Sequence, residues 1–178
     1  MPWTGIGSRK VPAHIFHMMR QFAELKRSVC RTGGALGSDH AFFLGAQNLE
    51  LLLPWKDFNG HTTGTHTYTK PQLKFADSVL KEAYQFQISR YETQMFFRRN
   101  VFQVLGICEN ERQIKKSKFV LCWTPDGATT IDDYNRDVTG GTGIAINVAS
   151  LFGVPVYNLQ RKDHRREIKE FIKERRAA

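Results

Sequence analysis

The chain has 178 residues, of which 41% are hydrophobic, and it carries a formal charge of +9. This length suits one domain with a sizeable core and is short for two, so we expect a single domain over residues 1–178. No apolar run approaches the ~20 residues that a membrane span requires, and residues 1–5 lack the basic-then-apolar pattern of a secretory signal. The sequence therefore argues against a membrane or exported protein and predicts a cytoplasmic one.

The positive charge is concentrated in three segments. Residues 9–31 carry six Lys/Arg against one acid, residues 98–118 six against two, and residues 161–178 eight against four. On one compact domain, such segments can form a surface for nucleic acid or for a phosphorylated small ligand. The alternative for the last segment is a solvated helix face.

Cysteine and histidine usage favours neither disulfides nor a metal site. The three cysteines lie in apolar segments without C-x-x-C spacing, so we expect reduced core residues. His61 and His66 have no cysteine or carboxylate cluster beside them, and we assign no metal ligands.

The first half of the chain alternates strand and helix patterns. Residues 3–6 predict a strand that enters a glycine turn at 5–12, and apolar residues spaced by three and four predict an amphipathic helix from 12 to about 31, with a short strand at 29–31. A second glycine stretch, 32–46, predicts a phosphate-binding turn whose helix is capped by Ser38 or Asp39; the alternative is a tight turn without a ligand. Residues 49–54 form a near-continuous apolar run, which is typical of a strand covered on both faces.

The second half begins with a loop of about 15 residues at 55–70, a length that favours a lid or binding loop. Residues 71–106 predict two helices with a break around 87–91. Residues 119–123 predict a strand followed by a turn at 124–127, and residues 139–143 a third glycine turn that opens a helix. A last strand is predicted at 154–159 and a basic C-terminal helix at about 162–176.

This alternation predicts an α/β, Rossmann-like fold: a mostly parallel sheet of about five strands with helices on both faces. In such sheets, ligands bind beyond the carboxyl ends of the strands, at the point where the strand order reverses. All three glycine turns fall at that edge of the predicted sheet. We therefore expect them to form one anion site.

Several motifs resemble the SLOG superfamily of Rossmann-like proteins, and more narrowly its small phage-type members labelled DNA-processing protein A-like. The matching motifs are Gly5-Ile6-Gly7-Ser8-Arg9, Gly33-Gly34-Ala35-Leu36-Gly37-Ser38-Asp39 with Gly45-Ala46, Cys122-Trp123-Thr124-Pro125-Asp126-Gly127, and Gly140-Gly141-Thr142 before Pro155-Val156-Tyr157-Asn158-Leu159. The resemblance covers residues 3–160. It implies a nucleotide or nucleotide-derived ligand, such as an ADP-ribose-like molecule, held by the three turns, in a homodimer or higher homo-oligomer. A phage-encoded member would act in the cytoplasm of the host cell.

The resemblance leaves three functions open: binding of a nucleotide signal, DNA recombination mediation, and Lonely Guy-type phosphoribohydrolysis. The last is the least favoured, because in register with the glutamate of the Lonely Guy motif the chain has Asn147. An amide can neither accept a proton nor stabilise an oxocarbenium-like centre by charge. We therefore argue for no catalytic residue.

The candidate ligand-binding residues come from the turns and from two aromatic segments. Arg9 can fork two hydrogen bonds onto a phosphate, and Asp39 can accept from a ribose hydroxyl or cap its helix. Trp55 and Phe58 can stack on a base, and Arg99 lies beside two phenylalanines. The full set is Gly7, Ser8, Arg9, Gly33, Gly34, Ala35, Gly37, Asp39, Trp55, Phe58, Asn59, Arg99, Asn100, Trp123, Thr124, Gly140, Gly141 and Thr142.

Overall fold

The protein is built on a five-stranded, all-parallel sheet in the order β3-β2-β1-β4-β5. The computed structural model describes residues 1–177. The strands are short: β1 (Trp3–Gly5), β2 (Cys30–Thr32), β3 (Leu49–Leu51), β4 (Val120–Cys122) and β5 (Val156–Asn158). The chain builds outward from β1 to β3 and then returns to the other side of β1, so the strand order reverses between β1 and β4. This is the point at which Rossmann-like sheets bind ligands.

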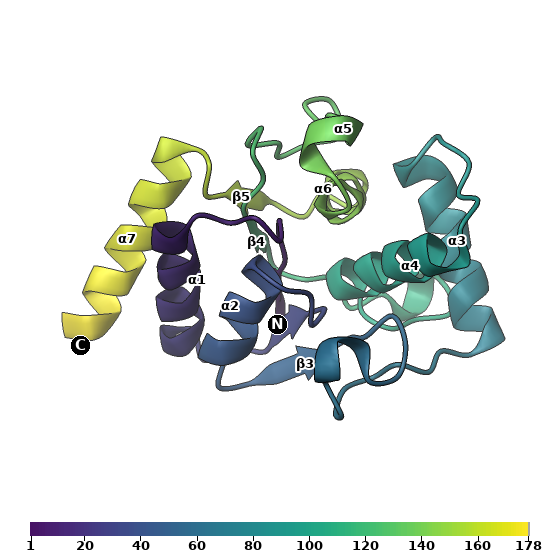
Figure 1. The fold of residues 1–178 in the computed structure, drawn as a ribbon, viewed down its shortest axis with the longest axis horizontal. Coiled ribbons are helices and arrows are strands. Elements are labelled where there is room, and N and C mark those ends of the chain that lie inside the picture. The colour runs from purple at the N-terminus through teal and green to yellow at the C-terminus, as the bar shows by residue number, and fades with distance from the viewer. Residues whose placement is uncertain (178) are drawn as a thin grey trace.

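Helices cover both faces of this sheet (Figure 1). One face carries α1 (Ala13–Leu25), α2 (Ser38–Gly45) and α7 (Lys162–Ala177). The other carries α3 (Lys70–Ala83), α4 (Tyr91–Leu105) and α6 (Thr142–Leu151). Short helical turns η1 (Phe58–Gly60), η2 (Glu111–Gln113) and α5 (Arg136–Thr139) lie in the connections. The predicted Rossmann-like architecture and the basic C-terminal helix are both confirmed.

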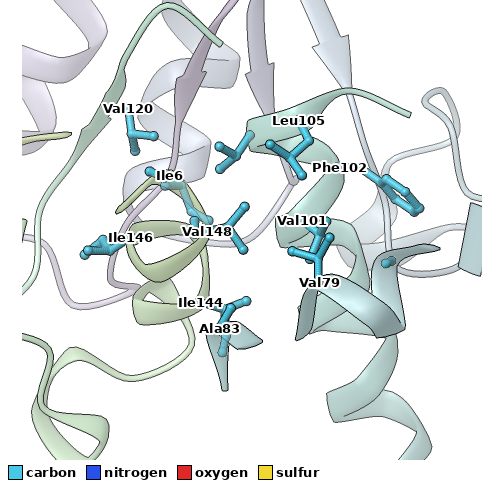
Figure 2. Close-up of a cluster of buried hydrophobic side chains, with 14 of the residues drawn as sticks. Ile6, Val79, Ala83, Val101, Phe102, Leu105, Val120, Ile144, Ile146 and Val148 are labelled. Carbon is cyan, nitrogen blue, oxygen red and sulfur yellow. The ribbon is translucent and has the colours of Figure 1, made fainter. Parts of the chain in front are cut away.

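Each face has its own hydrophobic core. Under α3, α4 and α6, side chains of all three helices meet Ile6 and Val120 from the sheet side (Figure 2). On the opposite face Trp3 is fully buried, with edge-on contacts to Phe22 and Phe42 and a stacked contact to Phe119. The three cysteines are free and buried in these cores, as predicted.

Two predicted elements are corrected. The first helix ends at Leu25 rather than near 31, because Lys26 is extended and the chain needs residues 26–29 to reach β2; Val29 is 40% exposed. The predicted strand 49–54 is shorter: β3 spans Leu49–Leu51 at the edge of the sheet, and Leu49 and Glu50 are only half-buried, so it is not covered on both faces. Its apolar run is explained differently: Leu52 and Leu53 are buried where the chain leaves the sheet.

The connection after β3 runs to Lys70, where a capping box formed by Thr69 and Gln72 opens α3. Helices α3 and α4 are separated at 84–90, close to the predicted break. Within residues 1–177, no helix combines the length and the apolar character needed to cross a bilayer.

Candidate functional site

A pocket of about 460 Å³ lies at the carboxyl edge of the sheet. Five segments line it: 6–10 after β1, 35–39 after β2, 58–59 in η1, 93–100 in α4 and 138–142 at the start of α6. Parts of the three glycine turns chosen from the sequence therefore contribute to one wall. Twelve predicted residues line the pocket: Gly7, Ser8, Arg9, Ala35, Asp39, Phe58, Asn59, Arg99, Asn100, Gly140, Gly141 and Thr142.

Three predicted glycines, Gly33, Gly34 and Gly37, lie outside the pocket wall. A Cβ on Gly33 would collide with the Arg99 guanidinium, and one on Gly34 would lie 2.8 Å from both His61 and Leu53. Gly37, at φ 77°, is packed against the backbone of Arg9. These glycines let chain segments cross closely.

Trp55, Trp123 and Thr124 also lie outside the pocket wall. Trp123 packs in the core under α1 and α7 and donates to Gln160 at 3.2 Å, and Thr124 is buried against Asn158. Trp55 makes edge-on contacts with Phe58 and Phe96, with ring centroids 5.3 and 5.0 Å apart. It therefore supports two pocket-lining rings from behind.

A buried ion pair forms the inner wall. Arg99 Nη1 of α4 donates to Asp39 Oδ2 of α2 at 3.2 Å, and the two side chains are 5% and 2% exposed. The backbone N–H of Gly33 donates to the same oxygen at 3.1 Å. Burial raises the pKa of Asp39, and the charge of Arg99 opposes that rise. The pair ties the second glycine turn to the helix on the opposite face of the sheet.

The expected helix cap is absent from α2. Its N-cap is Gly37, and no side chain caps it. The Ser38 hydroxyl donates to the carbonyl of Ser8 at 3.0 Å, and the Asp39 carboxylate accepts a hydrogen bond from Arg99. Both side chains therefore join the first two turns to their surroundings.

Three buried polar atoms in the pocket-lining residues have no hydrogen-bond partner. They are Asp39 Oδ1, Arg99 Nε and Asn100 Oδ1. The backbone N–H groups of Ala35 and Gly33 also act to lower the pKa of Asp39. Asn100 is held in place by its amide, which donates to the carbonyl of Gly141 at 2.9 Å. Buried polar atoms are rarely left unpaired, and these three lie beneath the pocket surface with almost no contact with solvent.

The pocket favours an anion at its mouth. Arg9 and Lys10 are exposed there, and Asp39 is the one acidic residue among the described residues of the wall. With Arg99, the lining side chains carry three positive charges and one negative charge, a net +2. A Cβ on Gly140 would meet no atom within 4 Å, and one on Gly141 would meet only Phe97, at 4.0 Å, so the backbone that opens α6 is accessible.

An aromatic group lines another side of the pocket. Phe58, Phe96 and Phe97 contribute to its wall, and the Arg99 guanidinium carbon lies 5.7 Å from the centre of the Phe96 ring. Eight residues of the wall were not among the candidates: Ile6, Lys10, Leu36, Thr93, Phe96, Phe97, Val138 and Thr139. Phe96 and Phe97 had been noted only as the aromatic neighbours of Arg99, and Lys10 directly follows Arg9.

No family model, curated protein or solved structure matches the chain. The resemblance to the SLOG superfamily accordingly stays a prediction. The functional proposal therefore rests on the geometry of the pocket.

Asn147, which the resemblance sets in register with the Lonely Guy glutamate, does not line the pocket. It is 1% exposed, and its amide donates to the carbonyl of Ala83 at 2.8 Å, joining α6 to α3. In this chain the residue packs two helices together.

Asn147→Ala should consequently destabilise the protein without changing ligand binding. Removing the amide leaves a buried carbonyl unpaired, which costs about 1–3 kcal/mol. Urea unfolding measures the loss. A variant that kept its stability but lost affinity for nucleotides would place Asn147 in the site instead.

Proposed function

We propose that the pocket binds a nucleotide-derived small molecule, with its phosphate at the glycine turns. The observation that carries this proposal is the convergence of three turns, selected from sequence alone, on one cavity with a net positive lining. Its volume of about 460 Å³ falls in the range of roughly 300–1,000 Å³ that is usual for small-molecule sites.

Two kinds of wall suit two parts of such a ligand. Arg9, Lys10 and the exposed backbone of Gly140 and Gly141 suit a phosphate, since guanidinium groups and helix N-termini both attract anions. The three phenylalanines suit a planar base.

Arg9→Ala is the direct test of the phosphate end. A hydrogen bond to a charged group contributes about 1.5–3 kcal/mol, so the affinity for ADP or ADP-ribose should fall roughly 10- to 100-fold, measured by isothermal titration calorimetry. Thermal stability should hardly change, because Arg9 is exposed.

Arg27→Ala is the matched control, since Arg27 is also exposed and lies outside the pocket wall. It should bind as the unmodified protein does. Equal affinity in the Arg9 and Arg27 variants would remove Arg9 from the site.

A further inference from the structure

The third glycine turn of the pocket has little packing of its own. Gly140 has a φ of 64°, and a Cβ on it would meet no atom within 4 Å. A Cβ on Gly141 would meet only Phe97, at 4.0 Å. Because glycine restricts the backbone so little, packing does not fix the orientation of the peptide groups in this turn. That orientation depends on hydrogen bonds.

The hydrogen bonds of the turn direct carbonyl groups into α6 and N–H groups away from it. The carbonyls of Gly140 and Gly141 accept from N–H groups of the first helical turn, at 3.0 and 3.3 Å. The N–H groups of Gly141 and Thr142 donate no hydrogen bond within residues 1–177. Since a peptide group is planar and trans, the Thr142 N–H points opposite to the Gly141 carbonyl. In this orientation the turn offers donors to an anion, whereas a flipped peptide would offer it a carbonyl oxygen.

Asn100 of α4 stabilises that orientation. Its Nδ2 donates to the Gly141 carbonyl at 2.9 Å, so this oxygen has a second donor besides the helix. Asn100 is 3% exposed, and its Oδ1 is buried without a partner. The preceding residue, Arg99, bonds to Asp39 of the second turn. Consecutive residues of α4 therefore hold two of the three glycine turns.

We infer that Asn100 is a positioning residue for the phosphate of the ligand. It acts through Gly141, whose carbonyl it holds so that the N–H of Thr142 stays available to a phosphate oxygen. The inference rests on the proposed function of the pocket. Arg9, in contrast, would contact the phosphate through its own charge. The effect of Asn100 should accordingly be confined to compounds that carry a phosphate.

Asn100→Ala, titrated with ADP and with adenosine in the calorimeter, separates positioning from packing. A hydrogen bond to a charged group changes affinity by roughly tenfold or more. The affinity for ADP should therefore fall about tenfold in the variant. The affinity for adenosine, which has no phosphate, should not change. A residue that only packs the pocket would alter both affinities together, so the ratio of the two is the deciding measurement.

Asn147→Ala is the matched control. Asn147 is also buried, its amide also donates to a backbone carbonyl, at 2.8 Å, and its Oδ1 is also unpaired, but it lies outside the pocket wall. It should keep the ratio of the two affinities while losing stability. Should Asn100→Ala fail to fold in urea and melting experiments, Asn100→Leu repeats the test, because leucine fills similar space without a donor.

An unchanged ratio in the folded Asn100 variant would overturn the positioning role, and so would an equal fall of the ratio in the Asn147 variant. Both results leave the nucleotide pocket intact, since the unmodified protein still binds ADP. An unmodified protein that binds neither compound would contradict the proposed function itself, and the role of Asn100 with it.

Discussion

Replacing Arg99 with methionine should lower the free energy of unfolding by roughly 3–5 kcal/mol at neutral pH, the loss typical of a buried ion pair deprived of one partner. Asp39 would remain almost fully buried, with only the backbone N–H groups of Gly33 and Ala35 to stabilise its charge. Urea unfolding of the variant and the unmodified protein measures the difference.

The loss should depend on pH in a defined direction. Burial already raises the pKa of Asp39 in the folded protein, and without Arg99 the opposing attraction disappears, so the pKa rises further. The folded state then holds its proton more tightly than the unfolded chain does. Stability of the variant should be greatest below the unfolded value of about 3.9 and should fall as pH rises toward the folded pKa.

The double variant Asp39→Asn with Arg99→Met is the control. It removes both charges, so it should recover a large part of the stability that the single change loses. A single variant whose deficit is small and independent of pH would contradict the buried ion pair.

Gly37→Ala should be nearly as damaging, for a steric reason. Gly37 has φ 77°, and a Cβ there would lie 2.5 Å from the carbonyl oxygen of Arg9 and 2.6 Å from its Cα. A positive φ costs a non-glycine residue about 1–2 kcal/mol and overpacking about 1–3 kcal/mol, so we expect a loss of roughly 2–5 kcal/mol. Displacement of Arg9 should also weaken nucleotide binding.

Gly60→Ala tests a glycine of positive φ that has room for a side chain. Gly60 has nearly the same φ, 79°, but a Cβ there would meet no atom within 4 Å. It should cost only about 1–2 kcal/mol. If the two alanine variants were equally stable, the close crossing of the first two turns would not contribute to folding.

The sequence predicted the sheet and the position of the pocket well, because both depend on local patterns. Short apolar segments marked the strands, and the glycine turns marked their carboxyl ends. The predictions that failed depend on contacts between residues that are distant in the sequence. Leu52 and Leu53 are apolar because they are buried beyond the sheet, and the pattern of an apolar run cannot distinguish that from a strand covered on both faces.

The glycines illustrate the same limit in the site. In the sequence, Gly33 and Gly141 both predict a backbone that another group can approach closely. In the fold, Gly33 is packed against Arg99, whereas Gly141 faces open space. The sequence could not predict the ion pair either, because Asp39 and Arg99 are 60 residues apart in the chain. Sequence singled out each residue, but only the fold pairs them.

The most direct test of the proposed function is mass spectrometry of small molecules released by denaturing the purified protein. The proposal predicts a phosphorylated compound with an ultraviolet-absorbing base, close to one per chain, and its absence from a Gly141→Leu variant, in which a side chain fills the space before the backbone of α6. If the protein is purified without a bound ligand, calorimetric titration with AMP, ADP, NAD and ADP-ribose replaces mass spectrometry. The unmodified protein should then bind at least one of these compounds, and the Gly141→Leu variant should bind none. An unmodified protein that releases no such compound and binds none of the four, or a Gly141→Leu variant that binds equally well, would contradict the nucleotide pocket.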